Sequence, residues 1–193
     1  MPDAAAASAA PPPATGNAGL LAGIRAFALE EPGAAVGFVA RLARENRWTR
    51  SHAARVVEEY RRFMFLAVAA GHPVAPSDAV DQAWHLHLLQ TRSYWDRFCP
   101  LVLGRRIHHE PSRGGRQEAA RIRDWYARTL ASYRRLLGEP PPDIWPEAAA
   151  RFAGGPRPAR IDLARHWVIR KPWAGALRPP AIARIDSPTG GPS

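Results

Sequence analysis

Apolar residues recur at three- and four-residue steps along five stretches of the chain, which is the spacing of amphipathic helices. The stretches are residues 19–30, 34–46, the segment between Thr49 and Gly71, 78–99 and 116–137. No stretch alternates apolar and polar residues in the manner of a strand. The pattern therefore predicts an all-α fold, a compact bundle of four or five helices.

Residues that start and stop helices support these boundaries. Thr49 and Ser77 are well placed as N-caps, and Gly71 and Gly138 as C-terminal stops. Cys99-Pro100 is predicted to close the fourth helix after about six turns. The prolines at positions 140–142 predict an extended segment that ends at Trp145-Pro146.

The fourth predicted helix carries one apolar stripe that should face the core. Its members follow 4-3-4-3-4 spacing: Val80, Trp84, His87, Thr91, Tyr94 and Phe98. A histidine on such a stripe is most often a buried structural residue. We therefore expect His87 to be hydrogen-bonded to a tyrosine or a backbone carbonyl.

The predicted position of the neighbouring His85 is different. An α-helix turns about 100° per residue, so His85 and His87 point to nearly opposite sides and cannot chelate one metal. His85 follows Asp81 by one turn, which allows either a surface ion pair or a carboxylate that orients the imidazole. Both interpretations stay open.

A second histidine pair, His108-His109, follows in an irregular stretch that could turn back toward the fourth helix. A site built from Asp81, His85 and one of these two would offer ligands suited to zinc, iron or another divalent metal. Cys99 is an unfavourable co-ligand, because an unbroken helix would place it about 21 Å from His85. We expect Cys99 to be a small buried residue instead.

Composition and charge add limits on organisation and partners. Residues 1–18 are predicted to be a disordered leader, 19–150 the helical domain, and 151–193 a mostly disordered tail rich in Pro, Gly and Arg. The net charge is +10, but 26 of the 27 basic residues are arginine, and residues 151–193 hold eight of them against two acidic residues. This favours compositional bias over selection for nucleic-acid binding. A single cysteine and the lack of a 20-residue apolar run predict a cytoplasmic protein without a membrane span.

The residues of the fourth helix and the stretch after it resemble the glycine-rich domain-containing protein-like family, a domain of unknown function, in its bacterial form. The pattern comprises Trp84, His85, His87, Thr91, Tyr94, Cys99, Gly104, Arg105 and His108-His109. The resemblance covers about residues 34–147 and implies a helical fold, without a mechanism. The glycine-rich region for which the family is named is missing, since the 15 glycines are dispersed.

The sequence contains no Gly-rich phosphate loop, nucleophile elbow or cysteine pair. It therefore favours a non-enzymatic helical module that contacts another protein. The alternative is a metal-binding protein or metal-dependent enzyme that uses Asp81, His85 and His108 or His109. A third hypothesis is nucleic-acid binding through the basic tail.

Overall fold

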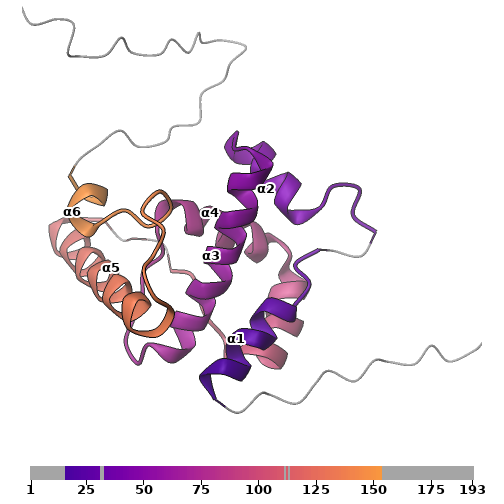
Figure 1. Ribbon diagram of the computed structural model, residues 1–193, viewed down its shortest axis with the longest axis horizontal. Coiled ribbons are helices and arrows are strands. Elements are labelled where there is room, and N and C mark those ends of the chain that lie inside the picture. The colour runs from indigo at the N-terminus through magenta and orange to yellow at the C-terminus, as the bar shows by residue number, and fades with distance from the viewer. Residues whose placement is uncertain (1–15, 31–32, 111, 113, 154–193) are drawn as a thin grey trace, which may run out of the picture. The chain divides into compact units, whose positions relative to one another are not determined.

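The computed structural model describes residues 16–30, 33–110, 112 and 114–153 (Figure 1). These residues form six α-helices and one π-helix, and no strand: α1 (Asn17–Ala26), α2 (Phe38–Asn46), α3 (Arg50–Ala69), α4 (Asp78–Leu89), the π-helix η1 (Arg92–Leu103), α5 (Arg116–Leu137) and α6 (Ala148–Arg151). The all-α prediction is confirmed, although the helical elements are more numerous than predicted and some are shorter. Most of the predicted leader and tail lies outside the described residues.

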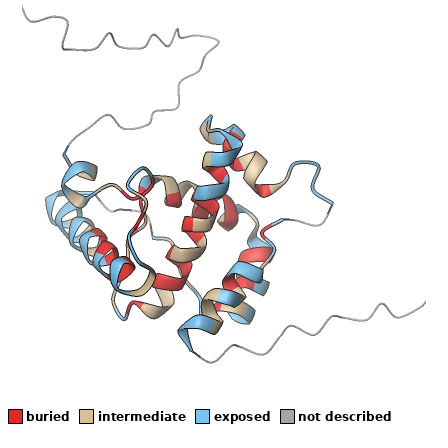
Figure 2. Cartoon of the chain, in the orientation of Figure 1, coloured by how far each residue is buried: buried red, intermediate tan, exposed pale blue. Residues whose placement is uncertain are grey.

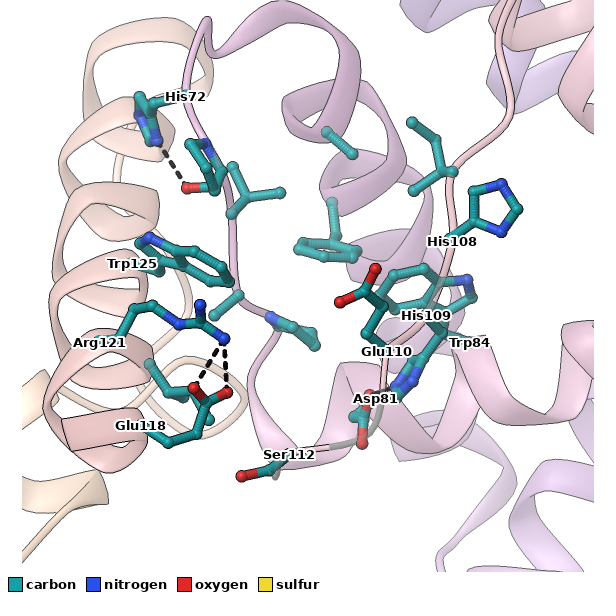
Figure 3. Close-up of a pocket in the computed structure, with 18 of the residues that line it drawn as sticks. His72, Asp81, Trp84, His108, His109, Glu110, Ser112, Glu118, Arg121 and Trp125 are labelled. Carbon is teal, nitrogen blue, oxygen red and sulfur yellow. Dashed lines mark hydrogen bonds and ion pairs between the residues drawn. The ribbon is translucent and has the colours of Figure 1, made fainter. Parts of the chain in front are cut away.

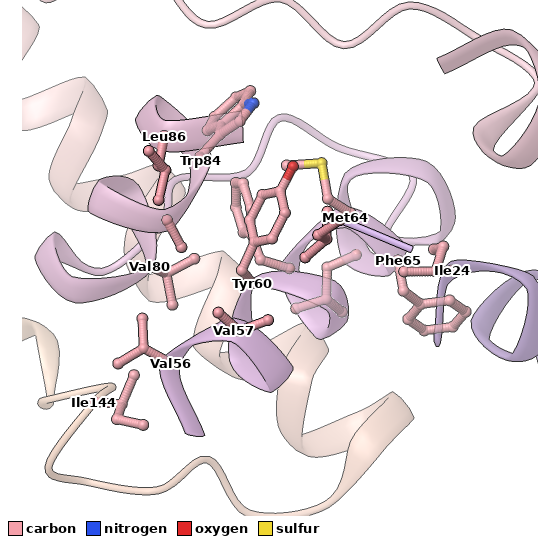
Figure 4. Close-up of a cluster of buried hydrophobic side chains, with 14 of the residues drawn as sticks. Ile24, Val56, Val57, Tyr60, Met64, Phe65, Val80, Trp84, Leu86 and Ile144 are labelled. Atoms are coloured by element: carbon pink, nitrogen blue, oxygen red, sulfur yellow. The ribbon is translucent and has the colours of Figure 1, made fainter. Parts of the chain in front are cut away.

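Helix α3 is the element around which the others pack (Figure 1). It contacts α1, α2, α4, η1 and α5. Its buried side chains, among them Tyr60 and Met64, belong to the same core cluster as Val80, Trp84 and Leu86 of α4 (Figure 4). Full burial of one such side chain contributes roughly 1.5–3 kcal/mol. No helix in the described part of the chain has the length and apolar character that a membrane crossing requires.

A buried carboxylate fixes α5 against α3. Glu59 of α3 is 5% exposed, and one of its oxygens accepts hydrogen bonds from the Tyr133 hydroxyl (2.7 Å) and the Trp145 indole N–H (2.9 Å). Arg62 lies 3.4 Å from the other oxygen. The charge of Glu59 is therefore paired and hydrogen-bonded, as a buried carboxylate requires. Figure 2 shows the resulting burial on the α3-facing side of α5.

Both predicted N-caps are present. The Thr49 and Ser77 hydroxyls accept the backbone N–H groups of His52 and Val80, respectively. Helix α5 has the predicted bounds, and Gly138 follows it at a φ of 89°. Helix α2 begins at Phe38 instead of residue 34, because the Glu30 carboxylate accepts the Phe38 N–H and so supplies its N-terminal partner.

The predicted unbroken helix from residue 78 to 99 is wrong. Helix α4 ends at Leu89, and Gln90 turns the chain with a ψ of 64° before η1 begins. No Gly or Pro causes the break. It lets Ser93 hydrogen-bond to His87 and lets Tyr94 pack on the same ring, so tertiary contacts outweigh helix continuity.

The break corrects three further expectations. Thr91 is exposed and does not belong to the core stripe, whereas Tyr94 and Phe98 are buried. Pro100 lies inside η1 and does not end it. Cys99 is fully buried, as expected, but no continuous helix of about 21 Å joins it to His85.

The segment after α5 also differs from its prediction. Residues 142–144 form a turn, in which the Trp145 N–H donates to the Pro141 carbonyl, instead of a fully extended run. Helix α6 was not predicted. Its Arg151 binds the Asp78 carboxylate and the Pro76 carbonyl, and so ties α6 to the start of α4.

His87 is the predicted structural histidine, and the tyrosine partner is confirmed. Its Nδ1 is 2.7 Å from the Tyr60 hydroxyl, and its Nε2 is 3.3 Å from the Ser93 hydroxyl. Five aromatic rings from four elements or their caps surround it: Phe27, Phe38, Tyr60, Tyr94 and Phe98. Burial, and after it the Arg97 charge, lowers the pKa of His87 to about 3.

We predict that this neutral histidine makes the fold sensitive to mild acid. The pKa is lower in the folded chain than in the unfolded one, so acid favours unfolding. The contribution is complete above pH 6.5 and is lost as the pH falls toward 3, at roughly 1.4 kcal/mol per pH unit. Urea unfolding at pH 6.5 and pH 5 should therefore show a loss of about 2 kcal/mol from His87.

The variant His87→Gln separates this contribution from other acid effects. It should be less stable than the parent chain at both pH values. Its free energy of unfolding should fall by about 2 kcal/mol less than that of the parent between pH 6.5 and pH 5. The pKa of His109 is raised, so His109 changes the free energy of unfolding mainly above pH 6.5 and contributes little between pH 6.5 and pH 5. An equal pH difference in parent and variant would contradict the assignment.

Candidate functional site

Three of the predicted site residues come together beside the N-terminal part of α4. Asp81 and His85 lie one helical turn apart on the same face, and His109 approaches them from the segment after η1. One ligand atom from each lies within 4.8 Å of the others. The His109 Nε2 is 2.7 Å from Asp81 Oδ1, and the His85 Nε2 is 3.8 Å from Asp81 Oδ2.

The three side chains differ in exposure and charge. His85 is 49% exposed, against 26% for Asp81 and 20% for His109. The hydrogen bond that His109 donates to Asp81 is the main cause that raises the pKa of His109, and burial opposes it. The cluster is therefore partly buried at Asp81 and His109 and open to solvent at His85.

The Tyr94 hydroxyl fixes the segment that carries His109. It accepts the Trp84 indole N–H (3.0 Å) and donates to the Ile107 carbonyl (2.6 Å), two residues before His109. The His109 ring then packs edge-on against Trp84, with 4.5 Å between ring centroids. Burial raises the pKa of Tyr94, which keeps this hydroxyl protonated and able to donate.

Other residues of the motif support the same segment. Gly104 ends η1 with a φ of 68°, a conformation that strains residues with a side chain. The exposed Arg105 donates its backbone N–H to the Cys99 carbonyl. The Cys99 sulfur interacts with the Ile107 backbone and the Tyr94 side chain, while burial raises its pKa. The motif is thus largely a set of supports for the residues before His109.

His108 and His87 do not join the cluster. The exposed His108 packs against Trp95, with 5.0 Å between ring centroids, and points away from Asp81 (Figure 3). His87 lies in the core, on the opposite side of α4 from His85, as the helical geometry requires. Of the two histidines after η1, the structure brings only His109 to Asp81.

A pocket of about 530 Å³ adjoins the cluster, and Asp81 and His109 form part of its wall (Figure 3). The pocket lies between α4 and α5. Residues 72–76 line it and are tied to α5, because the Ala75 N–H donates to the Thr129 hydroxyl and His72 Nε2 is 2.7 Å from the Ser132 hydroxyl. The volume is in the usual range for a small-molecule site.

The chain matches the model of the UCP032817-like family over residues 29–129. This is more than half of its length. The chain belongs to the UCP032817-like family. No curated protein and no solved structure matches it.

The family region runs from the start of the α1–α2 connection into α5. It contains Asp81, His85 and His109 together with the Trp84 and Tyr94 side chains that position the loop. The family name states no activity, so the function has to be argued from the site.

Several pocket residues were not identified as site residues from the sequence. They are His72, Glu110, Glu118, Arg121 and Trp125. The Glu118 and Arg121 pair had a visible signal, an acidic and a basic residue three positions apart on one helix. The others needed the packing of α5 against α3, which no local pattern encodes.

We predict that Tyr94→Phe releases His109 without unfolding the chain. The substitution leaves the Trp84 N–H and the Ile107 carbonyl without this partner, at a cost of about 1–3 kcal/mol. The weaker hold on His109 should lower its pKa toward 6.5. NMR titration of the histidine ring protons measures this shift.

Tyr126→Phe is a matched control, since it removes a buried hydroxyl that donates to the Pro146 carbonyl, away from the cluster. It should reduce stability by a similar amount and leave the pKa of His109 unchanged. If both variants left that pKa unchanged, Tyr94 would not be the residue that positions His109.

Proposed function

We propose that this protein binds a divalent transition metal, zinc or iron, through Asp81, His85 and His109. The proposal rests on one observation above all: the ligand atoms of these three residues lie within 4.8 Å of one another. Two imidazoles and a carboxylate are a donor set that both metals accept.

The spacing is compatible with coordination after small side-chain movements. Ligand atoms about 2.1 Å from a tetrahedral metal lie about 3.4 Å apart. The His85 Nε2 to Asp81 Oδ2 distance of 3.8 Å is close to this value. The His109 Nε2 to Asp81 Oδ1 distance of 2.7 Å is shorter, so His109 would move slightly away from that oxygen.

Three protein ligands leave at least one coordination position open, as in catalytic and not in structural zinc sites. Because Asp81 and His109 also line the pocket, a molecule held there would meet the open position. A bound metal would supply Lewis acidity at that point. The chain's own contribution is to fix His109 through Tyr94 and to shape the pocket.

A simple ion pair is the main competing explanation of the cluster. A protonated His109 beside Asp81 accounts for their 2.7 Å contact without any metal. The His85 Nε2, 3.8 Å from the other Asp81 oxygen, fits the same explanation. A shared metal would account in addition for the approach of the His85 and His109 rings, whose centroids lie 4.4 Å apart.

Contacts with another protein remain the alternative. Among the described residues, the large apolar side chains that are exposed are Val36, Leu89 and Leu101. Isolated exposed apolar residues are ordinary on protein surfaces, so no specific surface supports this alternative. Binding of nucleic acid through residues 151–193 stays a prediction, since most of that tail lies outside the described residues.

The relation to glycine-rich domain-containing proteins, in their bacterial form, is also part of the proposal. It rests on the spaced pattern from Trp84 to His109. That pattern combines the supports of the loop with two of the three candidate ligands.

We predict that the full chain, produced without a histidine tag and freed of metal, binds one zinc ion. His85→Ala, His109→Ala and Asp81→Ala should each weaken binding at least tenfold, a loss already typical of residues that only support a metal ligand. Isothermal titration calorimetry with zinc measures both stoichiometry and affinity.

His108→Ala is the matched control, because it removes an imidazole next to His109 that does not contact Asp81. Its zinc affinity should equal that of the parent chain. Absence of stoichiometric zinc binding, or equal affinity in parent and His109→Ala, would contradict the proposed centre and favour the ion pair.

A further inference from the structure

We infer that the pocket beside the cluster binds a small, flat, mainly apolar molecule through a carboxylate that it directs at the metal. This inference rests on the proposed metal centre and names the class of molecule that the centre would meet. Shape, lining and charge of the pocket each contribute to it.

Aromatic and aliphatic side chains make up most of the pocket wall. Trp84 of α4 and Trp125 of α5 come from opposite sides, and Phe63, Val74 and Ile122 complete the apolar lining (Figure 3). Indole rings offer large flat surfaces that bind flat apolar groups well. The volume of about 530 Å³ suits a small molecule and excludes a folded partner.

The charges of the lining determine which polar group the molecule carries. The wall holds three carboxylates, Asp81, Glu110 and Glu118, and two guanidinium groups, Arg121 and Arg151. Its net charge is −1 with neutral histidines and 0 with His109 protonated, and a bound divalent metal, which needs neutral histidine ligands, changes it to +1. The loaded pocket therefore attracts an anion that the metal-free pocket does not favour.

The two guanidinium groups are held at the pocket wall by contacts within the protein. Arg121 binds the Glu118 carboxylate through its Nη2 and lies 4.8 Å from the centre of the Trp125 ring. Its side chain is 50% exposed. Arg151 is bound to Asp78 and stacks on Tyr126. Both guanidinium groups are therefore already paired with carboxylates, and the metal would be the positive centre that an anion meets.

A carboxylate is the anionic group that fits the metal end. Zinc and iron accept carboxylate oxygens, and Asp81 and His109 place the metal at the pocket wall. An amide of the same shape has neither the charge nor a comparable metal affinity. The ligand should therefore depend both on its charge and on the metal.

The test uses benzoate as the probe and benzamide as its neutral counterpart, with the full chain loaded with cobalt(II). Cobalt absorption reports on the metal, and tryptophan fluorescence reports on the pocket wall. Benzoate should change both signals and bind at least tenfold more tightly than benzamide. It should also bind at least tenfold more tightly to the cobalt form than to metal-free protein.

Substitutions on the far wall separate the pocket from the metal. Trp125→Ala and Trp125→Leu should weaken benzoate at least tenfold and leave cobalt affinity unchanged. Trp48→Ala is the matched control, since Trp48 is equally half-buried but does not line the pocket. It should leave benzoate affinity unchanged, and circular dichroism checks that each variant folds.

The outcomes distinguish this inference from the proposed function. If cobalt binds but benzoate binds no better than benzamide, or equally well without cobalt, the carboxylate inference is overturned and the metal centre stands. If neither cobalt nor zinc binds to the cluster, both are overturned. Unchanged benzoate affinity in both Trp125 variants would place the ligand outside this pocket and overturn the inference.

Discussion

The hydroxyl group of Tyr94 is the contact on which the arrangement of the site depends. It joins three parts of the chain: the Trp84 indole on α4, its own helix η1, and the Ile107 carbonyl in the segment that follows. This segment has no secondary structure of its own between Gly104 and Glu110. Without an internal anchor its backbone would sample many conformations, and His109 would have no fixed position.

The break between α4 and η1 makes that contact possible. It lets Ser93 and Tyr94 pack against the buried His87, and the wider π-helix then continues through Pro100. A π-helix is rare, and such segments occur frequently at functional sites. Here one irregular element serves both the core, through His87, and the surface cluster, through the residues before His109. Core packing and site geometry are therefore coupled in this fold.

The sequence predicted the parts of the fold that depend on local chemistry. Helix α5 has the predicted bounds because its apolar stripe is long and Gly138 stops it, and Ser77 caps α4 as its hydroxyl should. The α4 break could not be predicted, since residues 89–92 contain neither Gly nor Pro and only tertiary contacts of His87 favour the turn. Pro100 suggested a helix end, but the π-helix accommodates it.

The same division applies to the site. Helical periodicity alone predicted that Asp81 and His85 share a helix face and that His87 lies in the core. It could not choose between His108 and His109, because the direction of each ring depends on how Tyr94 holds Ile107. The pocket was not predicted at all, since Trp125 and Trp84 line one pocket only when α5 packs on α3 through the buried Glu59.

The central claim is that the motif positions His109 to complete a metal centre with Asp81 and His85. A crystal structure of the zinc-loaded chain, with anomalous data collected at the zinc edge, tests it most directly. The account predicts one anomalous peak about 2.0–2.2 Å from a carboxylate oxygen of Asp81 and from the Nε2 atoms of His85 and His109. A peak coordinated by His108 instead of His109, or no peak at this cluster in zinc-loaded crystals, would contradict it.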